Sequence, residues 1–322
     1  MITASAPGKV ILFGEHAVVY GRPAIAVPVT QVQATATLRP GRRGVIIQSI
    51  DTHETIVLDR AGPNHPLAAI VRSTLKQLGL FTADLSILVR STIPIAGGLG
   101  SGAAVSTAIV RALGLWATSN LAKVQTTEGR APSPGYFDDA TISNLVYEIE
   151  KLHHGTPSGI DNTVIAYHKP VYFMRDQPIQ TFTVARPFTV AIGNTGLASP
   201  TKIAVGDVRK NWEADRDHYE ARFDQIGAVA QAARAAIEGG QIERLGLLMD
   251  RNQELLRAIT VSSPELDRLI DAAKSAGAAG AKLVGGGRGG NMIALVDESK
   301  REAVVAALKD AGATSVIVTE IV

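Results

Sequence analysis

A glycine-rich segment from Gly98 to Ala103 lies between a predicted strand and a predicted helix. The backbone N–H groups of such a turn, together with the positive end of the helix dipole, can bind a phosphate or another anion. Ser101 would either cap the helix or place its hydroxyl on a bound cation. Taken alone, the segment is explained as well by a plain glycine turn with a capping residue as by a phosphate-binding loop.

The common nucleotide-binding motifs do not account for this segment. Its letters satisfy the dinucleotide-binding pattern G-x-G-x-x-A, but no predicted strand ending in Asp or Glu follows about 20 residues later. A Walker A motif is excluded because Gly8-Lys9 is followed by Val10. The HRD and DFG tripeptides of protein kinases are absent from the sequence. A nucleotide bound by this loop would therefore require another fold.

A second segment, Pro7 to Gly21, places Lys9, Glu15 and His16 at the end of a predicted buried strand. Lysine is unusual inside an apolar strand. Lys9 therefore either has a chemical role or lies at an edge where its amine reaches solvent.

A third segment follows the predicted helix 139–153. Glu150 and His154 are spaced i,i+4 and would share one helix face. An ion pair on that face explains the spacing better than a transition-metal site, since no H-E-x-x-H motif is present. Asp161 comes next, beside an apolar stretch where a carboxylate needs a partner, and Lys9 is a candidate.

A further glycine cluster, Gly285 to Gly290, is interrupted by Arg288. Apolar predicted strands flank the cluster directly, so a flexible linker is a poor explanation for it.

The elements that position these segments form two groups along the chain. The length of 322 residues suits two domains. Strands dominate the first 60 residues or so, and from Phe188 onward a strand precedes long helical patterns over 201–237, 241–258 and 264–276. Strand-rich and helix-rich stretches alternate irregularly, which predicts an α+β fold instead of regular βαβ units. The predicted domains are residues 1–185 and 186–322.

Composition excludes several classes of protein. The absence of cysteine excludes disulfides, thiolate metal sites and a cysteine nucleophile. A formal net charge of +2 is too small for a nucleic-acid-binding surface. The longest uncharged run, Ser91 to Val110, contains Pro94 and several glycines, so it does not suit a membrane span. Without a signal peptide pattern, the expected location is the cytoplasm.

Together these segments resemble the GHMP small-molecule kinase superfamily, most closely its mevalonate kinase branch. The resemblance rests on four motifs in the family's order, which are P-G-K-V-I-L-F-G-E-H-A-V-V-Y-G at 7–21, G-L-G-S-G-A at 98–103, H-G-T-P-S-G-I-D-N at 154–162, and T-G with S-P-T-K at 195–202. It implies a two-lobe GHMP kinase fold with the active site in the inter-lobe cleft. It also implies ATP- and Mg²⁺-dependent phosphorylation of the 5-hydroxyl of (R)-mevalonate, and homodimers are common among such enzymes.

The resemblance also implies roles for individual residues. Asp161 would act as general base beside the substrate hydroxyl, and Lys9 would pair with it. Mevalonate would be positioned by Glu15, His16 and Thr201, and Mg²⁺ would be held by Ser101 and Glu150. The ATP phosphates would be wrapped by Gly97, Gly98, Leu99, Gly100, Ser101, Gly102 and Ala103.

This chain departs from the family pattern in both glycine segments. Gly102 stands where a second serine is common, while Val284, Arg288 and Asn291 replace the usual Thr, Gly and Cys. We hypothesise that Arg288 contacts a phosphate or the substrate carboxylate. The alternatives are a phosphomevalonate kinase, a mevalonate 3-kinase or a non-catalytic binding member of the family.

Overall fold

The computed structural model describes residues 1–80, 83–94, 98–120, 137–154, 158–199 and 201–322. The chain forms two compact units. The first unit comprises residues 1–8, 32–94 and 100–168, and the second comprises residues 9–31, 95–99 and 169–322. The two units alternate along the chain, whereas the sequence-based division is a single cut after residue 185.

The first unit is a sheet covered by helices. Its strands run in the order β4 (Glu54–Val57), β3 (Val45–Ser49), β5 (Leu85–Ser91) and β2 (Ala24–Pro40), and β1 (Ile2–Phe13) pairs with β2. Strand β3 is parallel to β5, and β2 is antiparallel to it. Buried and exposed residues alternate along β3, as expected for a sheet with one covered face.

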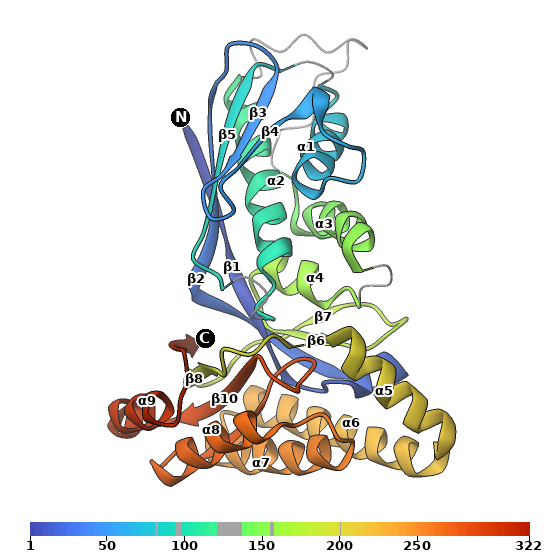
Figure 1. Cartoon of the computed structure of the whole chain (residues 1–322), viewed down its shortest axis with the longest axis vertical. Coiled ribbons are helices and arrows are strands. Elements are labelled where there is room, and N and C mark those ends of the chain that lie inside the picture. Colours follow the sequence, from blue (N-terminus) through green and yellow to red (C-terminus); the bar gives the residue numbers. More distant parts are fainter. Residues whose placement is uncertain (81–82, 95–97, 121–136, 155–157, 200) are drawn as a thin grey trace. The chain divides into compact units, whose positions relative to one another are not determined.

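Helices α1 (Pro66–Gln77), α2 (Ser101–Asn120) and α3 (Asp139–His154) lie on one face of this sheet (Figure 1). The short helix α4 (Ile160–Tyr167) packs against α3. The buried amide of Asn162 donates to the carbonyl oxygen and the hydroxyl of Ser143, at 3.1 and 2.8 Å. This side-chain contact fixes the start of α4 against α3.

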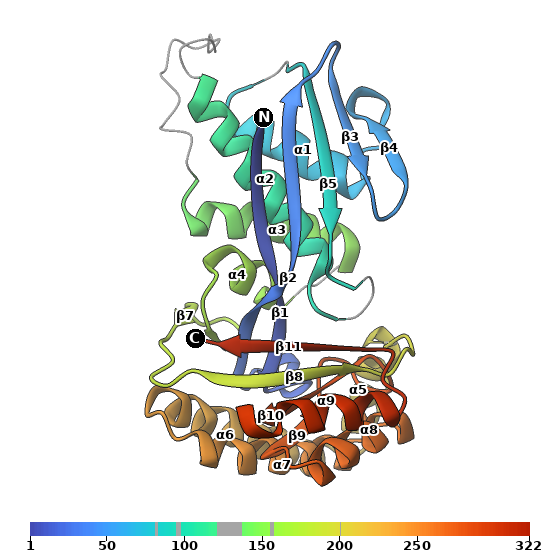
Figure 2. The same ribbon diagram turned by 90° about the vertical axis from the view of Figure 1, so that its left-hand side faces the viewer.

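The second unit contains a four-stranded antiparallel sheet. Its order is β11 (Ser315–Ile321), β8 (Phe188–Asn194), β10 (Asn291–Val296) and β9 (Gly280–Leu283). Figure 2 shows α6 (Arg216–Glu238), α7 (Ile242–Ala258), α8 (Pro264–Ser275) and α9 (Arg301–Asp310) on one side of this sheet. The second unit also contains α5 (Thr201–Ala214) and the strands β6 (Val171–Phe173) and β7 (Gln180–Thr181). The end of β1 and the start of β2 belong to it too, and β6 pairs with β2 at Ala24–Ala26.

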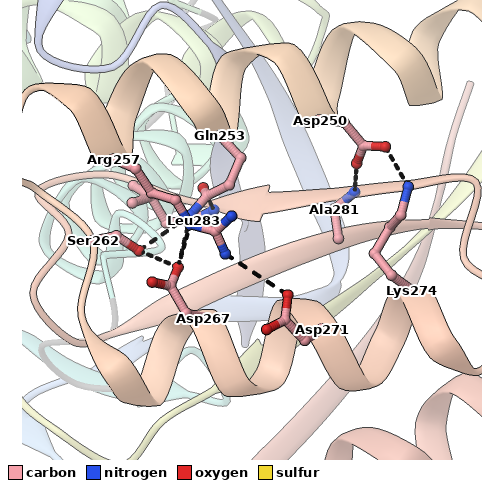
Figure 3. A network of polar contacts seen from close by, with 9 residues as sticks. All are labelled: Asp250, Gln253, Arg257, Ser262, Asp267, Asp271, Lys274, Ala281 and Leu283. Carbon is pink, nitrogen blue, oxygen red and sulfur yellow. Dashed lines mark hydrogen bonds and ion pairs between the residues drawn. The ribbon is translucent and has the colours of Figure 1, made fainter.

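Strand β9 is an edge strand whose backbone is bound by side chains of α7 (Figure 3). Asp250 accepts the N–H of Ala281 at 3.0 Å, and Gln253 accepts the N–H of Leu283 at 2.9 Å. The helix can come this close because Gly246 faces Gly280, where an added Cβ would lie 2.1 Å from the Gly246 oxygen. Both N–H groups that flank Lys282 are therefore satisfied, which fixes the position of that residue in the strand.

The structure confirms the α+β fold and corrects four local predictions. The helix predicted over 201–237 is two helices, because Asp215 caps a new N-terminus by accepting the N–H of His218. Residues 2–13 form one strand, where the sequence predicts two, 2–6 and 9–13. Helix α4 was not predicted. Helix α2 continues to Asn120, past its predicted end near Trp116 and into the predicted loop 118–136. The rest of that expected loop, 121–136, lies outside the described residues.

Candidate active site

In the second unit, the loop after β1 is anchored by a buried ion pair. Glu15 pairs with Lys282 of β9, and both side chains are fully buried. The amide of Asn252 on α7 donates to the other carboxylate oxygen of Glu15 at 3.0 Å. The ammonium of Lys282 also donates to the Leu283 carbonyl at 2.7 Å. Glu15, predicted to help position the substrate, therefore has both carboxylate oxygens engaged inside the protein.

His16 follows in a left-handed backbone conformation, with φ of 61°, and is buried. Its Nε2 lies 3.1 Å from the carbonyl oxygen of Gly286, to which a neutral imidazole donates. Burial, and to a lesser extent the positive charge of Arg288, lowers the pKa of His16 to about 4. His16 is therefore a neutral hydrogen-bond donor near pH 7, which makes it a positioning group and not a cation.

Acidification is expected to destabilise the fold through His16. Its pKa of about 4 in the folded protein lies below the ordinary 6.5, so the unfolded chain takes up the proton first as pH falls. The stabilisation is therefore complete above pH 6.5 and is lost as pH falls through 4, by roughly 2 kcal/mol between pH 7 and 5. Urea unfolding at these two pH values measures the loss. His16→Gln should remove this part of the pH dependence, and an unchanged dependence in the variant would contradict the assignment.

The glycine cluster between β9 and β10 is held by residues 195–199 and by Thr201 of the same unit. Ser199 donates its hydroxyl to the Gly287 carbonyl at 2.9 Å. A Cβ on Gly286 would lie 2.6 Å from the hydroxyl oxygen of Thr201, the first residue of α5. Glycine is therefore required at 286, and the structure brings Thr201 and His16 to the same turn. Arg288, expected to meet a phosphate or the substrate, is instead paired with Asp207 of α5.

In the first unit, the helix that follows the glycine loop begins at Ser101. A Cβ on Gly102 would lie 3.5 Å from Oε1 of Glu150, whose side chain is buried in the last part of α3. The structure thus places Glu150 at the N-terminal turn of α2, beside the residue after Ser101. A side chain at 102 would lie in ordinary contact with this carboxylate, so nothing in the structure explains the glycine that departs from the family pattern.

Asp161 lies in the first turn of α4 and is half-buried. Gly159 precedes the helix with φ of 87°, a left-handed conformation that glycine adopts without strain. A carboxylate in this turn is favoured by the helix dipole. The motif predicts a sharp turn between the helix 139–153 and Asp161, and the left-handed Gly159 fits this turn. Residues 155–157 of the same motif lie outside the described residues.

Lys9 is 5% exposed within β1, which contradicts the alternative that its side chain reaches solvent from an edge. Its N–H donates to the carbonyl of Leu99 at 2.9 Å, so the strand contacts the glycine loop. Lys9 belongs to the second unit and Asp161 to the first, and their pairing stays a prediction. Of the residues expected to bind ATP, Gly97 lies outside the described residues.

Sequence reasoning missed Lys282, Asn252 and Asp207. Lys282 gave a usable signal, because it lies between Ala281 and Leu283 in an apolar strand, as Lys9 does in its own. Asn252 and Asp207 lie on helices whose charged and polar residues resemble ordinary solvent-facing ones, so nothing in the sequence singles them out.

No group of three or more His, Cys, Asp or Glu side chains in the described part of the chain is arranged to hold a metal ion. Nor does any helix within the described ranges have the length and apolar character needed to cross a bilayer.

Comparison with known proteins identifies the family. Residues 65–169 match the GHMP kinases N terminal domain, and residues 233–314 match GHMP kinases C terminal. The mevalonate kinase of Pyrococcus abyssi is 33% identical over 98% of this chain and 95% of its own length. That of Aeropyrum pernix is 32% identical over 93% and 90%.

Solved structures agree with these relatives. The L. major mevalonate kinase in complex with R-mevalonate has a TM-score of 0.81 at 25% identity, covering 99% of this chain and 95% of that one. The Methanococcus jannaschii mevalonate kinase has a TM-score of 0.82 at 25% identity, covering 99% and 96%. With both domain matches and relatives of this similarity over nearly the whole length, the chain belongs to the GHMP kinase family.

Proposed function

We propose that this protein transfers the γ-phosphoryl group of ATP to the 5-hydroxyl of (R)-mevalonate, forming 5-phosphomevalonate for isoprenoid precursor synthesis. The observation that carries this proposal is the similarity to mevalonate kinases, about one residue in three identical over nearly the full length. The L. major relative was solved with R-mevalonate bound, which supports the choice of acceptor.

Residues 97–103 are proposed to bind the ATP phosphates through backbone N–H groups. The start of α2 at Ser101 supports this role, because the first N–H groups of a helix have no partner within the helix. Positioning and charge neutralisation are the main requirements of phosphoryl transfer. Backbone N–H groups can still position the phosphates and neutralise part of their charge when Gly102 replaces a serine.

Ser101 and Glu150 are proposed to hold Mg²⁺, which when bound would neutralise charge on the phosphates. The donor types fit, because Mg²⁺ with a nucleotide needs only one or two carboxylates in addition to phosphate oxygens and water. The carboxylate of Glu150 already lies beside the first turn of α2. Ser101 and Glu150 can take this role with α2 and α3 in the positions that they have in the structure.

On the acceptor side, Asp161 is proposed to take the proton of the substrate hydroxyl as the new P–O bond forms. Lys9 is proposed to stabilise negative charge on the attacking oxygen. Neutral His16 and Thr201, which each lie against Gly286, are proposed to orient mevalonate. Glu15 is proposed to support His16 by anchoring the loop.

Steady-state ADP release with Mg-ATP tests the function. The acceptors are mevalonate, 5-phosphomevalonate, homoserine and galactose. The control is the reaction with mevalonate and ATP from which Mg²⁺ is left out. We expect turnover on mevalonate alone and none without the metal. Turnover on 5-phosphomevalonate in place of mevalonate would assign the protein to the phosphomevalonate kinases. ATP binding with no turnover on any acceptor would favour a binding protein.

A mevalonate 3-kinase is the remaining alternative within the family. That enzyme would be expected to lack the residue corresponding to Lys9, which is present and buried here. The position of the new phosphate on the product distinguishes the two reactions directly. We infer a cytoplasmic location and homodimer formation from the same family relationship, and sedimentation of the purified protein tests the second.

A further inference from the structure

The turn between β9 and β10 contains an unusual residue. Gly285, Gly287, Gly289 and Gly290 all have positive φ, and Arg288 has φ of 56° among them. An arginine pays a steric penalty in this conformation that glycine avoids. Its side chain must therefore contribute something that a glycine at the same place would not.

The side chain and backbone of Arg288 join three segments of the second unit. The guanidinium pairs with Asp207 on α5, and both side chains are partly buried. Its Nε donates to the Thr260 carbonyl at 3.3 Å, and its backbone N–H donates to the Val261 carbonyl at 2.9 Å. The glycine turn is thus tied both to α5 and to the connection between α7 and α8.

The same turn contacts two residues that are proposed to orient the acceptor. Gly286 lies against Thr201 at the start of α5, and its carbonyl accepts from His16. Asp207 is six residues beyond Thr201 on the same helix, roughly 9 Å along its axis at 1.5 Å per residue. The turn therefore holds α5 at two places, through close packing at Thr201 and through the ion pair at Asp207.

We propose that Arg288 is a positioning residue, which with Asp207 forms a latch that holds α5 on the glycine turn and so fixes Thr201 and His16. This inference rests on the proposed function in one respect, namely that Thr201 and His16 orient the acceptor. This role replaces the hypothesis that Arg288 contacts a phosphate directly, because its guanidinium already pairs with the carboxylate of Asp207.

A double-mutant cycle separates the latch from a phosphate contact. We expect Arg288→Gln and Asp207→Asn each to lower kcat/KM for the acceptor by roughly three- to tenfold, as for a partly buried ion pair. The KM for ATP should stay unchanged. The double variant should have a kcat/KM for the acceptor no lower than that of the less active single variant. If Arg288→Gln alone raised the KM for ATP while Asp207→Asn left it unchanged or lowered it, Arg288 would be a phosphate ligand and the latch would be wrong.

Hydrogen exchange tests the latch without any assumption about the substrate. Amides of α5 should exchange faster in Arg288→Gln and in Asp207→Asn, with α9 as the internal reference. Arg186→Gln, which removes the exposed pair with Glu243, is the matched control and should change nothing. Unchanged exchange in α5 in both variants would overturn the latch, whereas an inactive wild type with faster exchange in the variants would overturn only the proposed function.

Discussion

Replacing Asp161 with asparagine is expected to lower kcat on mevalonate by a factor of about 10² to 10⁴, the range lost when a general base is removed. Asparagine keeps the size and one acceptor oxygen of the side chain but cannot take the proton of the hydroxyl. The KM for ATP should change little, because Asp161 is proposed to act on the acceptor hydroxyl and not to bind the ATP phosphates. Single-turnover formation of phosphomevalonate measures the chemical step directly.

The fold around Asp161 should survive this change. Ile160 and Val164 anchor α4 in the core, and Asn162 ties it to α3. Asp139→Asn is the matched control, since Asp139 is an exposed acid in the first turn of α3. If Asp161→Asn kept near wild-type kcat while unfolding normally, electrostatic stabilisation by Lys9 and the metal would suffice, and Asp161 would not be a base.

Replacing Lys282 with methionine is expected to destabilise the protein by about 3–5 kcal/mol, because it leaves the buried charge of Glu15 without its counter-ion. Burial lowers the pKa of Lys282, and the nearby carboxylate of Glu15 opposes that effect. The double variant Glu15→Gln with Lys282→Met removes both charges and should recover a large part of the loss. Urea unfolding of the three proteins measures the difference.

The matched control for this cycle is Lys274→Met. Lys274 pairs with Asp250 in the same part of the unit, but both side chains are about one-third exposed. Because solvent reaches both side chains, loss of this pair should cost less than loss of the buried one, on the order of 1 kcal/mol. Equal destabilisation by the two lysine substitutions would show that the buried position of the Glu15 pair has no special effect.

Much of the fold could be predicted from short-range patterns. Pro66 at the start and Gly79 at the end predict a helix over 66–78, and the structure places it at Pro66–Gln77. The break at Asp215 was missed because helical periodicity continues on both sides of it. Strand β1 was divided at Pro7-Gly8, although a proline is tolerated in a strand where its missing N–H is not needed.

From the sequence, only those site residues could be predicted that lie within a short motif. The glycine loop, Lys9, Glu15, His16 and Asp161 each lie in a recognisable segment. The partner of Glu15 lies 267 residues away along the chain, so no spacing rule could pair the two. The same holds for Arg288 and Asp207, which are 81 residues apart and meet only because the glycine turn lies against α5.

The binding of β9 by α7 also affects how the protein associates with other chains. An edge strand with free N–H groups is a template on which another chain can add a strand. Here Asp250 and Gln253 already accept the N–H groups of Ala281 and Leu283, so this edge offers few unused donors. Growth of the sheet into an aggregate at β9 therefore requires α7 to detach first. Resistance to aggregation at this edge is then set by the stability of α7 on the sheet and not by the residues of β9.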